Sequence, residues 1–270
     1  MLELHCHTTF SDGVLTPTEL VSLAKERGVK ALAITDHDTL GGWDEAVAAS
    51  KEAEIEIVPG VELSTVYNGR SLHILGYYPR RELIEKPLVE RLTGRKRRAA
   101  RMVEKLAEMG YPLEISRLEG NMAVCRPHIA SAMVRAGYVG STQEAFARFI
   151  GEDCPAYVHY EKFSSAEGIE LIRECDGVPV WAHPYLFRGG KVAEVLPELV
   201  SAGLMGIEVY HPDCSPSRQR QLLEYCQKYN LIATGGTDYH GSLSGRVRTQ
   251  LNHFQLPLSI LEKLKRAASV

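Results

Sequence analysis

Short apolar segments alternate with segments that read as helices of about 10 to 15 residues, and this rhythm governs both ends of the chain. Seven segments are predicted to be strands: 2–5, 31–35, 55–58, 72–76, 178–182, 206–210 and 231–235. Such alternation is typical of parallel βαβ units, which form either an open sheet or a closed barrel. We expect a distorted barrel, in which the chemistry collects on the loops that leave the C-terminal ends of the strands.

The alternation stops between residues 80 and 165, where the sequence reads as helices with no convincing strand. We therefore predict an α/β barrel built from residues 1–79 and 166–270, with a helical subdomain of residues 80–165 inserted between the two parts. Apolar residues make up 44% of the chain and charged residues 24%, which is ordinary for a globular protein and excludes the disordered and fibrous classes.

Charge and hydropathy narrow the choice of partners and compartment. The net charge of -3 gives no global signature of nucleic-acid binding. No segment approaches the roughly 20 apolar residues of a membrane span, and the first residues do not resemble a secretion signal. The six cysteines form no CxxC pair. These features predict a cytoplasmic protein with reduced thiols, no membrane association and no evident obligate protein partner.

Side chains of the types that bind metal ions occur at the end of nearly every predicted strand. They are His5, His7, Asp36, His37, Asp38, Glu62, His73, His183, His211, Asp238 and His240, and the loop after the first strand adds Asp12. An HxH on a strand places both imidazoles on one face, so His5 and His7 can bind the same ion. Imidazoles with carboxylates and no cysteine favour zinc, manganese or iron over calcium or a structural zinc site.

Some polar residues near these positions have other predicted roles. Asp36 and Asp38 flank His37, and either one could bind metal, orient a ligand imidazole or cap a turn. His159 and His253 lie outside the strand-end pattern and are predicted to be structural. Cys6 lies between the paired histidines, so its side chain is expected to point the other way, into the packing.

Six segments of the chain together resemble motifs of the PHP (polymerase and histidinol phosphatase) family of phosphoesterases. They read HCHTTFSDG, ITDHDTLGG, PGVELS, LHILGYY, WAHP and GTDYH, and RPHIA is the one recognisable piece within the predicted insertion. Within the family, the chain is most similar to stand-alone bacterial members described as nucleoside 3',5'-bisphosphate phosphatases and 5'-3' exoribonucleases.

The resemblance implies a distorted (β/α)7 barrel with a trinuclear metal site. It assigns ligand roles to His5, His7, Asp12, His37, Glu62, His73, His183, Asp238 and His240. In this mapping Glu62 bridges two ions. The expected cofactors are two or three divalent ions, which could be Mn²⁺, Fe²⁺, Zn²⁺ or Mg²⁺.

These features predict hydrolysis of a phosphate ester by a hydroxide held between two ions that lie about 4 Å apart. No serine or cysteine lies in a recognisable nucleophile motif. The expected substrate is a nucleotide: a 3',5'-nucleoside bisphosphate, a 5'-nucleotide such as AMP, or the 5' end of a short RNA.

Three further residues are predicted to act on the substrate. Arg126 and His128 begin a helix in the insertion and are expected to reach over the barrel mouth and bind phosphate, the alternative being an ordinary helix start with a solvated arginine. His211 could bind phosphate, protonate the leaving group or be structural. The basic helix of residues 95–105 could guide RNA, but its apolar stripe favours a solvated basic face.

Three alternative functions remain open from the sequence. The same metal cluster could act on histidinol phosphate or a sugar phosphate. An amidohydrolase acting on C–N bonds also has HxH on its first strand, but usually needs a bridging lysine where this chain has Glu62. A regulatory protein that binds metal and nucleotide without turnover is the third alternative.

Overall fold

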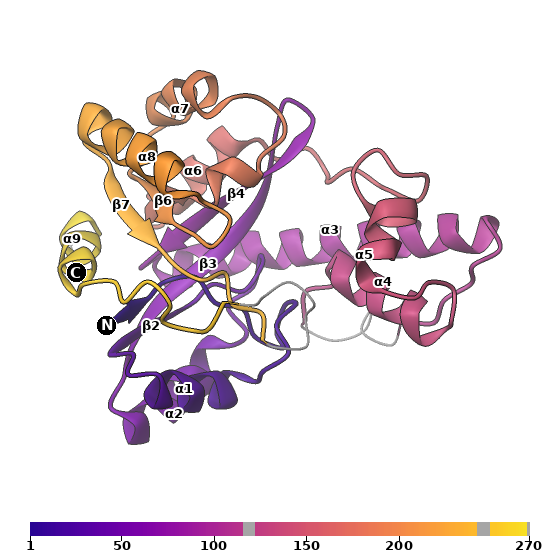
Figure 1. Ribbon diagram of the computed structural model, residues 1–270, viewed down its shortest axis with the longest axis horizontal. Coiled ribbons are helices and arrows are strands. Elements are labelled where there is room, and N and C mark those ends of the chain that lie inside the picture. Colours follow the sequence, from indigo (N-terminus) through magenta and orange to yellow (C-terminus); the bar gives the residue numbers. More distant parts are fainter. Residues whose placement is uncertain (116–121, 242–248, 269–270) are drawn as a thin grey trace.

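The computed structural model describes residues 1–115, 122–241 and 249–268, and its seven strands form one sheet that curls into a nearly closed barrel (Figure 1). In the sheet the strands follow the order of the chain: β1 (Leu2–Glu3), β2 (Ala31–Ile34), β3 (Glu56–Tyr67), β4 (Arg70–Tyr77), β5 (Val178–Trp181), β6 (Gly206–Tyr210) and β7 (Ile232–Gly235). Beyond β1 and β7 the chain pairs at Cys6 and Tyr239, where His7 N–H donates to the Tyr239 carbonyl at 2.9 Å. The predicted distorted barrel of seven strands is confirmed.

β4 is the one strand of this sheet that runs against its neighbours. It pairs antiparallel with β3 and β5, whereas the other adjacent pairs are parallel. Asn68 and Gly69 have φ angles of 48° and 72° and form the two-residue turn between β3 and β4, as Asn-Gly pairs do in hairpins. Reversal of β4 places its first half, with His73, at the rim where the parallel strands end.

Helices cover the outside of the barrel, and one helix covers the end at which β1 and β5 begin. The outer helices are α1 (Pro17–Glu26), α2 (Trp43–Ala53), α6 (Ser165–Glu174), α7 (Val192–Ser201) and α8 (Pro216–Tyr229). Their apolar faces pack on outward-facing strand residues such as Ile34 and Ile207. Leu264 of the helix α9 (Ser259–Ala267) belongs to one apolar cluster with Leu2 and Val178, which lie where β1 and β5 begin. The opposite rim is therefore the open end.

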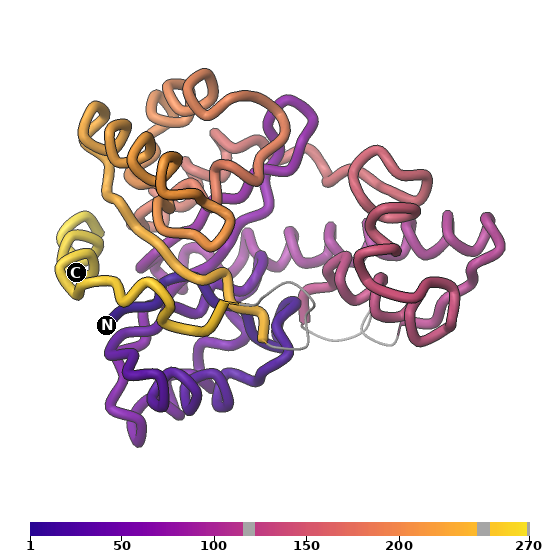
Figure 2. Tube along the Cα trace, in the orientation of Figure 1, coloured from indigo at the N-terminus to yellow at the C-terminus, as the bar shows by residue number. Residues whose placement is uncertain are grey.

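A helical segment between β4 and α6 extends away from the barrel (Figures 1 and 2). It contains α3 (Arg81–Glu108), α4 (Arg126–Arg135), α5 (Thr142–Ala145) and a π-helical turn, Phe146–Ile150. Met102 of α3 packs with Ile129 and Phe149 in a separate apolar cluster, while Leu88, nearer the start of α3, packs with the barrel core. One long helix thus joins the two cores. No helix within the described residues is long and apolar enough to cross a membrane.

Candidate metal centre

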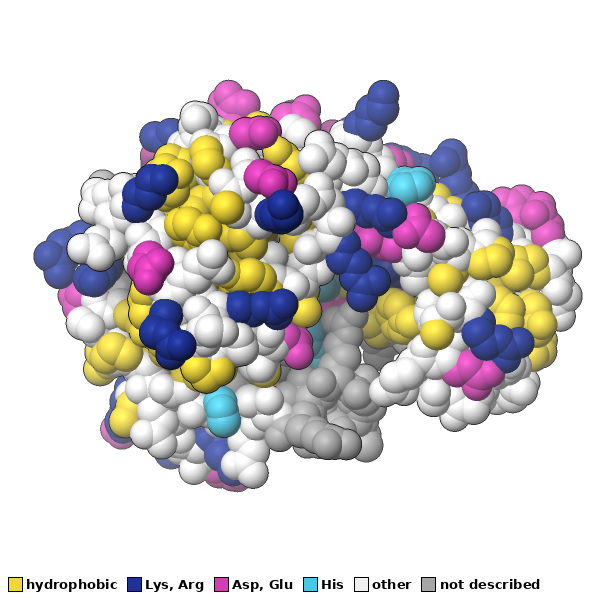
Figure 3. All heavy atoms as spheres, turned by 45° about the horizontal axis from the view of Figure 1, so that its top comes forward, with side chains coloured by type: hydrophobic (Ala, Val, Ile, Leu, Met, Phe, Trp, Pro, Cys, Tyr) yellow, Lys and Arg dark blue, Asp and Glu magenta, His cyan; other side chains and the backbone are white. Residues whose placement is uncertain are grey.

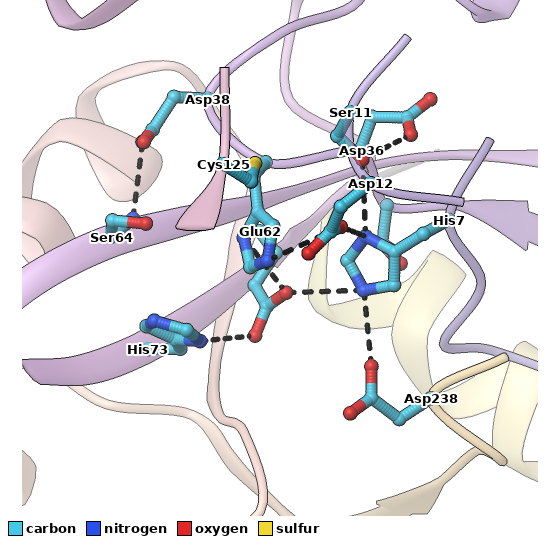
Figure 4. A network of polar contacts seen from close by, with 12 residues as sticks. His7, Ser11, Asp12, Asp36, Asp38, Glu62, Ser64, His73, Cys125 and Asp238 are labelled. Carbon is cyan, nitrogen blue, oxygen red and sulfur yellow. Dashed lines mark hydrogen bonds and ion pairs between the residues drawn. The ribbon is translucent and has the colours of Figure 1, made fainter. Parts of the chain in front are cut away.

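Ligand-type side chains converge at the open rim of the barrel (Figure 4). Three groups have ligand atoms that all lie within 4.8 Å of one another: His7, Asp12, His37 and His240; His5, His7, Glu62 and Asp238; and His37, Glu62 and His73. The groups share His7, His37 and Glu62, so they form one continuous cluster. Of the nine predicted ligands, eight belong to these groups, and the ninth, His183, lies with its Nε2 3.0 Å from Glu62 Oε1.

Glu62 lies at the centre of the cluster. Its Oε1 accepts hydrogen bonds from His73 at 2.7 Å and from His183 at 3.0 Å. Its Oε2 lies 3.4 Å from His5, 3.2 Å from His7 and 3.1 Å from His37. A buried carboxylate that meets imidazoles through both oxygens is suited to contact two cations at once. The geometry fits the bridging role predicted for Glu62.

The orientation of the imidazoles fits cation binding. His7 Nε2 lies 3.1 Å from Asp238 and 3.2 Å from Glu62, yet this nitrogen, His5 Nε2 and His37 Nδ1 are buried without a hydrogen-bond partner among the described residues. Asp12 Oδ1 is also buried and has no hydrogen-bond partner among the described residues. Buried polar atoms normally have partners, and several that face a common point are the signature of a bound ion. The donor set of imidazoles and carboxylates therefore fits divalent metal ions.

Tight backbone turns direct the ligands inward at the strand ends. His183 and Asp238 have φ angles of 33° and 50°, in the left-handed region that non-glycine residues adopt at a cost in free energy. Gly236 precedes Asp238, and a Cβ added there would lie 2.4 Å from the His5 Cβ. Only glycine allows these two segments to approach so closely.

Glu208 on β6 holds two of the ligands, and the sequence prediction did not include it. Its Oε1 accepts a hydrogen bond from His5 Nδ1 at 2.8 Å, and its Oε2 accepts the His183 backbone N–H at 2.8 Å. The bond to Nδ1 fixes the tautomer of His5 and leaves Nε2 free to face the cluster. A lone glutamate in the apolar strand segment GIEVY was the signal in the sequence.

Asp36 and Asp38 lie outside the three ligand groups, and both accept backbone hydrogen bonds next to the cluster. Asp36 accepts hydrogen bonds from the Thr8 backbone N–H at 2.7 Å and from the Ser11 hydroxyl at 2.6 Å, and so holds the loop that carries Asp12. Asp38 accepts the Ser64 backbone N–H at 3.1 Å.

The cluster forms the floor of a cleft of about 1520 Å³ between the barrel rim and the helical segment. In Figure 3 the surface is hollowed between these two parts, and histidine is visible inside. Arg126, His128 and His211 all line this cleft together with Asp12 and Glu62. His211 Nε2 lies 3.7 Å from Asp238 Oδ2. The structure therefore brings the three predicted substrate residues to the cleft that holds the candidate ligands.

The basic helix differs from the expectation of a solvated face. Arg95 and Arg98 are 4% and 5% exposed. Arg95 Nε donates to Asp38 Oδ2 at 2.5 Å, and Arg98 packs over the Tyr160 ring at 3.9 Å. Helical spacing places these two arginines on the inner side of α3, while Arg97 and Arg101 remain exposed. The solvated-face prediction is wrong for the two buried residues.

Comparison with known proteins identifies the family. The PHP domain model matches residues 3–94. A 5'-3' exoribonuclease from Haemophilus influenzae is 36% identical over 88% of this chain and 89% of its own length. A 3',5'-nucleoside bisphosphate phosphatase from Chromobacterium violaceum is 30% identical over 90% and 88%. The chain belongs to the PHP domain family.

Solved structures of similar chains agree with this assignment to the PHP family. A chain from Bifidobacterium adolescentis described as a candidate metal-dependent phosphoesterase has a TM-score of 0.86 at 30% identity and covers 98% of this chain and 96% of its own. A protein from Chromobacterium violaceum named as an amidohydrolase, with bound SO4 and no metal, has a TM-score of 0.87 at 28% identity with the same coverage. The predicted family and fold are confirmed.

The charges of the PHP cluster are mutually compensating. Burial opposes ionisation of Glu62, but the imidazoles of His37, His73 and His5 hold the pKa of this carboxyl well below its ordinary value. Burial likewise opposes protonation of His7, but Asp238 and Glu62 raise its pKa to about 10. In the metal-free protein, His7 therefore carries a proton at neutral pH that balances the buried carboxylates.

We expect metal binding to this PHP site to release protons and to strengthen as pH rises from 6 toward 9. His7 is protonated below its pKa of about 10, so a cation must displace that proton in order to bind there. Titration calorimetry with Mn²⁺ in buffers of different ionisation enthalpy measures the number of protons released. Binding enthalpies that are independent of the buffer would contradict this account.

Replacement Glu208→Gln should weaken metal binding about 10- to 100-fold, because a carboxylate that orients a ligand imidazole has that effect on affinity. The matched control is Glu224→Gln on the exposed face of α8, which should bind metal as the wild type does. Metal content after dialysis against a graded chelator is the measurement. If both variants retain the same amount of metal, Glu208 does not contribute to metal binding.

Proposed function

We propose that the chain is a metal-dependent phosphoesterase that hydrolyses a phosphate ester of a nucleotide. The substrate is a 3',5'-nucleoside bisphosphate, a 5'-nucleotide such as AMP, or the 5' end of a short RNA. The observation that carries the proposal is the shared cleft, in which the cluster around Glu62 faces Arg126. The names of similar proteins, a bisphosphate phosphatase and an exoribonuclease among them, support the same reaction class.

The predicted ligands and Arg126 would have distinct chemical tasks in this reaction. His5, His7, Asp12, His37, Glu62, His73, His183, Asp238 and His240 would hold two or three divalent ions. When bound, such ions polarise the phosphoryl group and lower the pKa of water. Arg126 would bind the phosphate oxygens through its planar guanidinium, aided by the N-terminus of α4 and by His128.

His211 would donate a proton to the leaving group. Burial disfavours its charged form, but Asp238 and Glu208 raise the pKa of this imidazole above its ordinary value. The Asp213 backbone N–H donates to His211 Nδ1 at 3.1 Å, which leaves the ring proton on Nε2, the nitrogen that lies 3.7 Å from Asp238 on the cleft side. An imidazole that carries its proton on Nε2 at this place would serve as the general acid for the leaving-group oxygen.

The dimensions and lining of the cleft favour a nucleotide over a smaller phosphate ester. Its volume of about 1520 Å³ exceeds the roughly 300–1,000 Å³ of typical small-molecule pockets. Arg135 and Arg188 add positive charge to the walls, and Phe146 adds an aromatic ring. Cationic walls with aromatic side chains suit phosphates and bases.

The amidohydrolase alternative lacks its key residue. Glu62 occupies the position where a bridging lysine was expected, and no lysine lines the cleft in the part of the chain that the structure describes. A purely regulatory binding protein would not need a proton donor such as His211 beside the cluster. The geometry therefore favours phosphate-ester hydrolysis.

The activity is tested by phosphate release from purified, Mn²⁺-loaded protein. The substrates are AMP, 3'-phosphoadenosine 5'-phosphate, a short 5'-phosphorylated RNA and histidinol phosphate. Nucleotide or RNA substrates should be hydrolysed, and chelation with EDTA should abolish turnover. Preferential hydrolysis of histidinol phosphate would show that the substrate is a smaller phosphate ester and not a nucleotide. If phosphate is released from none of the substrates, the proposed reaction is wrong.

Arg126→Ala should raise KM about tenfold or more while bound metal stays at the wild-type level, because the substituted side chain binds phosphate and not the ions. Arg101→Ala, on the exposed face of α3, serves as the matched control and should leave KM unchanged. Steady-state kinetics together with metal analysis separate the two effects. Loss of metal from the Arg126 variant would show that the residue supports the cluster instead.

A further inference from the structure

The start of α4 carries Arg126, and one buried side chain links this helix start to the barrel rim. Arg95 of α3 donates from Nε to Asp38 Oδ2 at 2.5 Å and from Nη2 to the Ser64 hydroxyl at 2.5 Å. Its third nitrogen, Nη1, donates to Cys125 Sγ at 3.1 Å. The guanidinium thus spans two barrel segments and the residue that precedes α4.

The barrel partners of Arg95 adjoin candidate metal ligands. Asp38 directly follows His37, has a left-handed φ of 51°, and donates its backbone N–H to the Glu62 carbonyl at 3.0 Å. Ser64 lies two residues beyond Glu62 on the same face of β3, and its backbone N–H donates to Asp38 (Figure 4). Arg95 therefore bonds to side chains that lie one residue from His37 and two residues from Glu62.

The partner on the other side is the cap of the substrate helix. Cys125 is the N-cap residue of α4, so the next side chain along the chain is Arg126. His128 Nδ1 accepts the Cys125 backbone N–H at 3.0 Å, which ties the second candidate phosphate residue to the same cap. Any shift of Cys125 relative to the barrel moves Arg126 and His128 with it.

The charged groups of Arg95 and Asp38 are buried, so they must stay paired with each other. Arg95 is 4% exposed and Asp38 is fully buried. A buried charge must be paired and hydrogen-bonded to be tolerated, and here the pairing fixes the guanidinium in one position. The planar fork of arginine reaches three acceptors in fixed directions, whereas a lysine ammonium acts as a point charge and cannot hold the same geometry.

We propose that Arg95 is a positioning residue that sets the placement of Arg126 and His128 relative to the metal-binding rim. It does not line the cleft, so it does not touch the substrate itself. This inference rests on the proposed phosphoesterase function for its kinetic readout. Binding of inorganic phosphate provides a second readout that does not require turnover.

The test uses Arg95→Lys in the full-length, Mn²⁺-loaded protein. Lysine retains the positive charge opposite Asp38 but loses the simultaneous bonds to Ser64 and Cys125. We expect inorganic phosphate to bind about tenfold more weakly and KM to rise by a similar factor, with metal content unchanged. The matched control is Arg97→Lys, because Arg97 lies on the same helix, is exposed, and pairs only with Glu161 among the described residues.

A double-mutant cycle separates positioning from general support of the fold. If Arg95 acts through Arg126, Arg95→Lys should have little further effect on phosphate affinity in an Arg126→Ala background. Additive losses in the two variants would overturn the inference, as would phosphate affinity equal to that of the Arg97 control. Failure of the wild type to hydrolyse any phosphate ester would overturn the proposed function, whereas the phosphate-binding cycle would still decide the role of Arg95.

Discussion

The structure depends on one electrostatic constraint: the buried carboxylate of Glu62 meets five imidazoles at the rim of the barrel. Those of His5, His7, His37, His73 and His183 all lie within 3.4 Å of its oxygens. Ionisable groups at this density are tolerable only when protons or cations balance the negative charges. Such a cluster costs stability, and its set of imidazoles and carboxylates fits divalent metal ions.

Barrel topology makes this convergence possible. The parallel strands end at one rim and deliver His5, His37, His183 and Asp238 there. Because β4 runs in the opposite direction, His73 reaches that rim from the beginning of its strand. The helical segment then supplies the facing wall, so that groups able to bind cations and groups able to bind phosphate occupy opposite sides of one cleft.

Sequence alone predicted the barrel and the ligand-type side chains, because both follow from local periodicity and from residue type at strand ends. It missed the reversal of β4, although Asn68-Gly69 is a hairpin signal. The roles of Glu208 and of the buried Arg95 were missed for a different reason, although the lone glutamate in GIEVY marked Glu208 as unusual. Each is defined by a partner far along the chain, such as His5 for Glu208, and a single sequence does not show which buried charges pair.

Anomalous X-ray diffraction at the manganese edge, from crystals soaked in Mn²⁺, tests the central claim most directly. Two or more peaks are expected at the rim, each surrounded by ring nitrogens and carboxylate oxygens at roughly 2.0–2.2 Å, with Glu62 contacting two of them. Peaks located elsewhere, or no ordered manganese at the rim under conditions that support activity, would contradict the account.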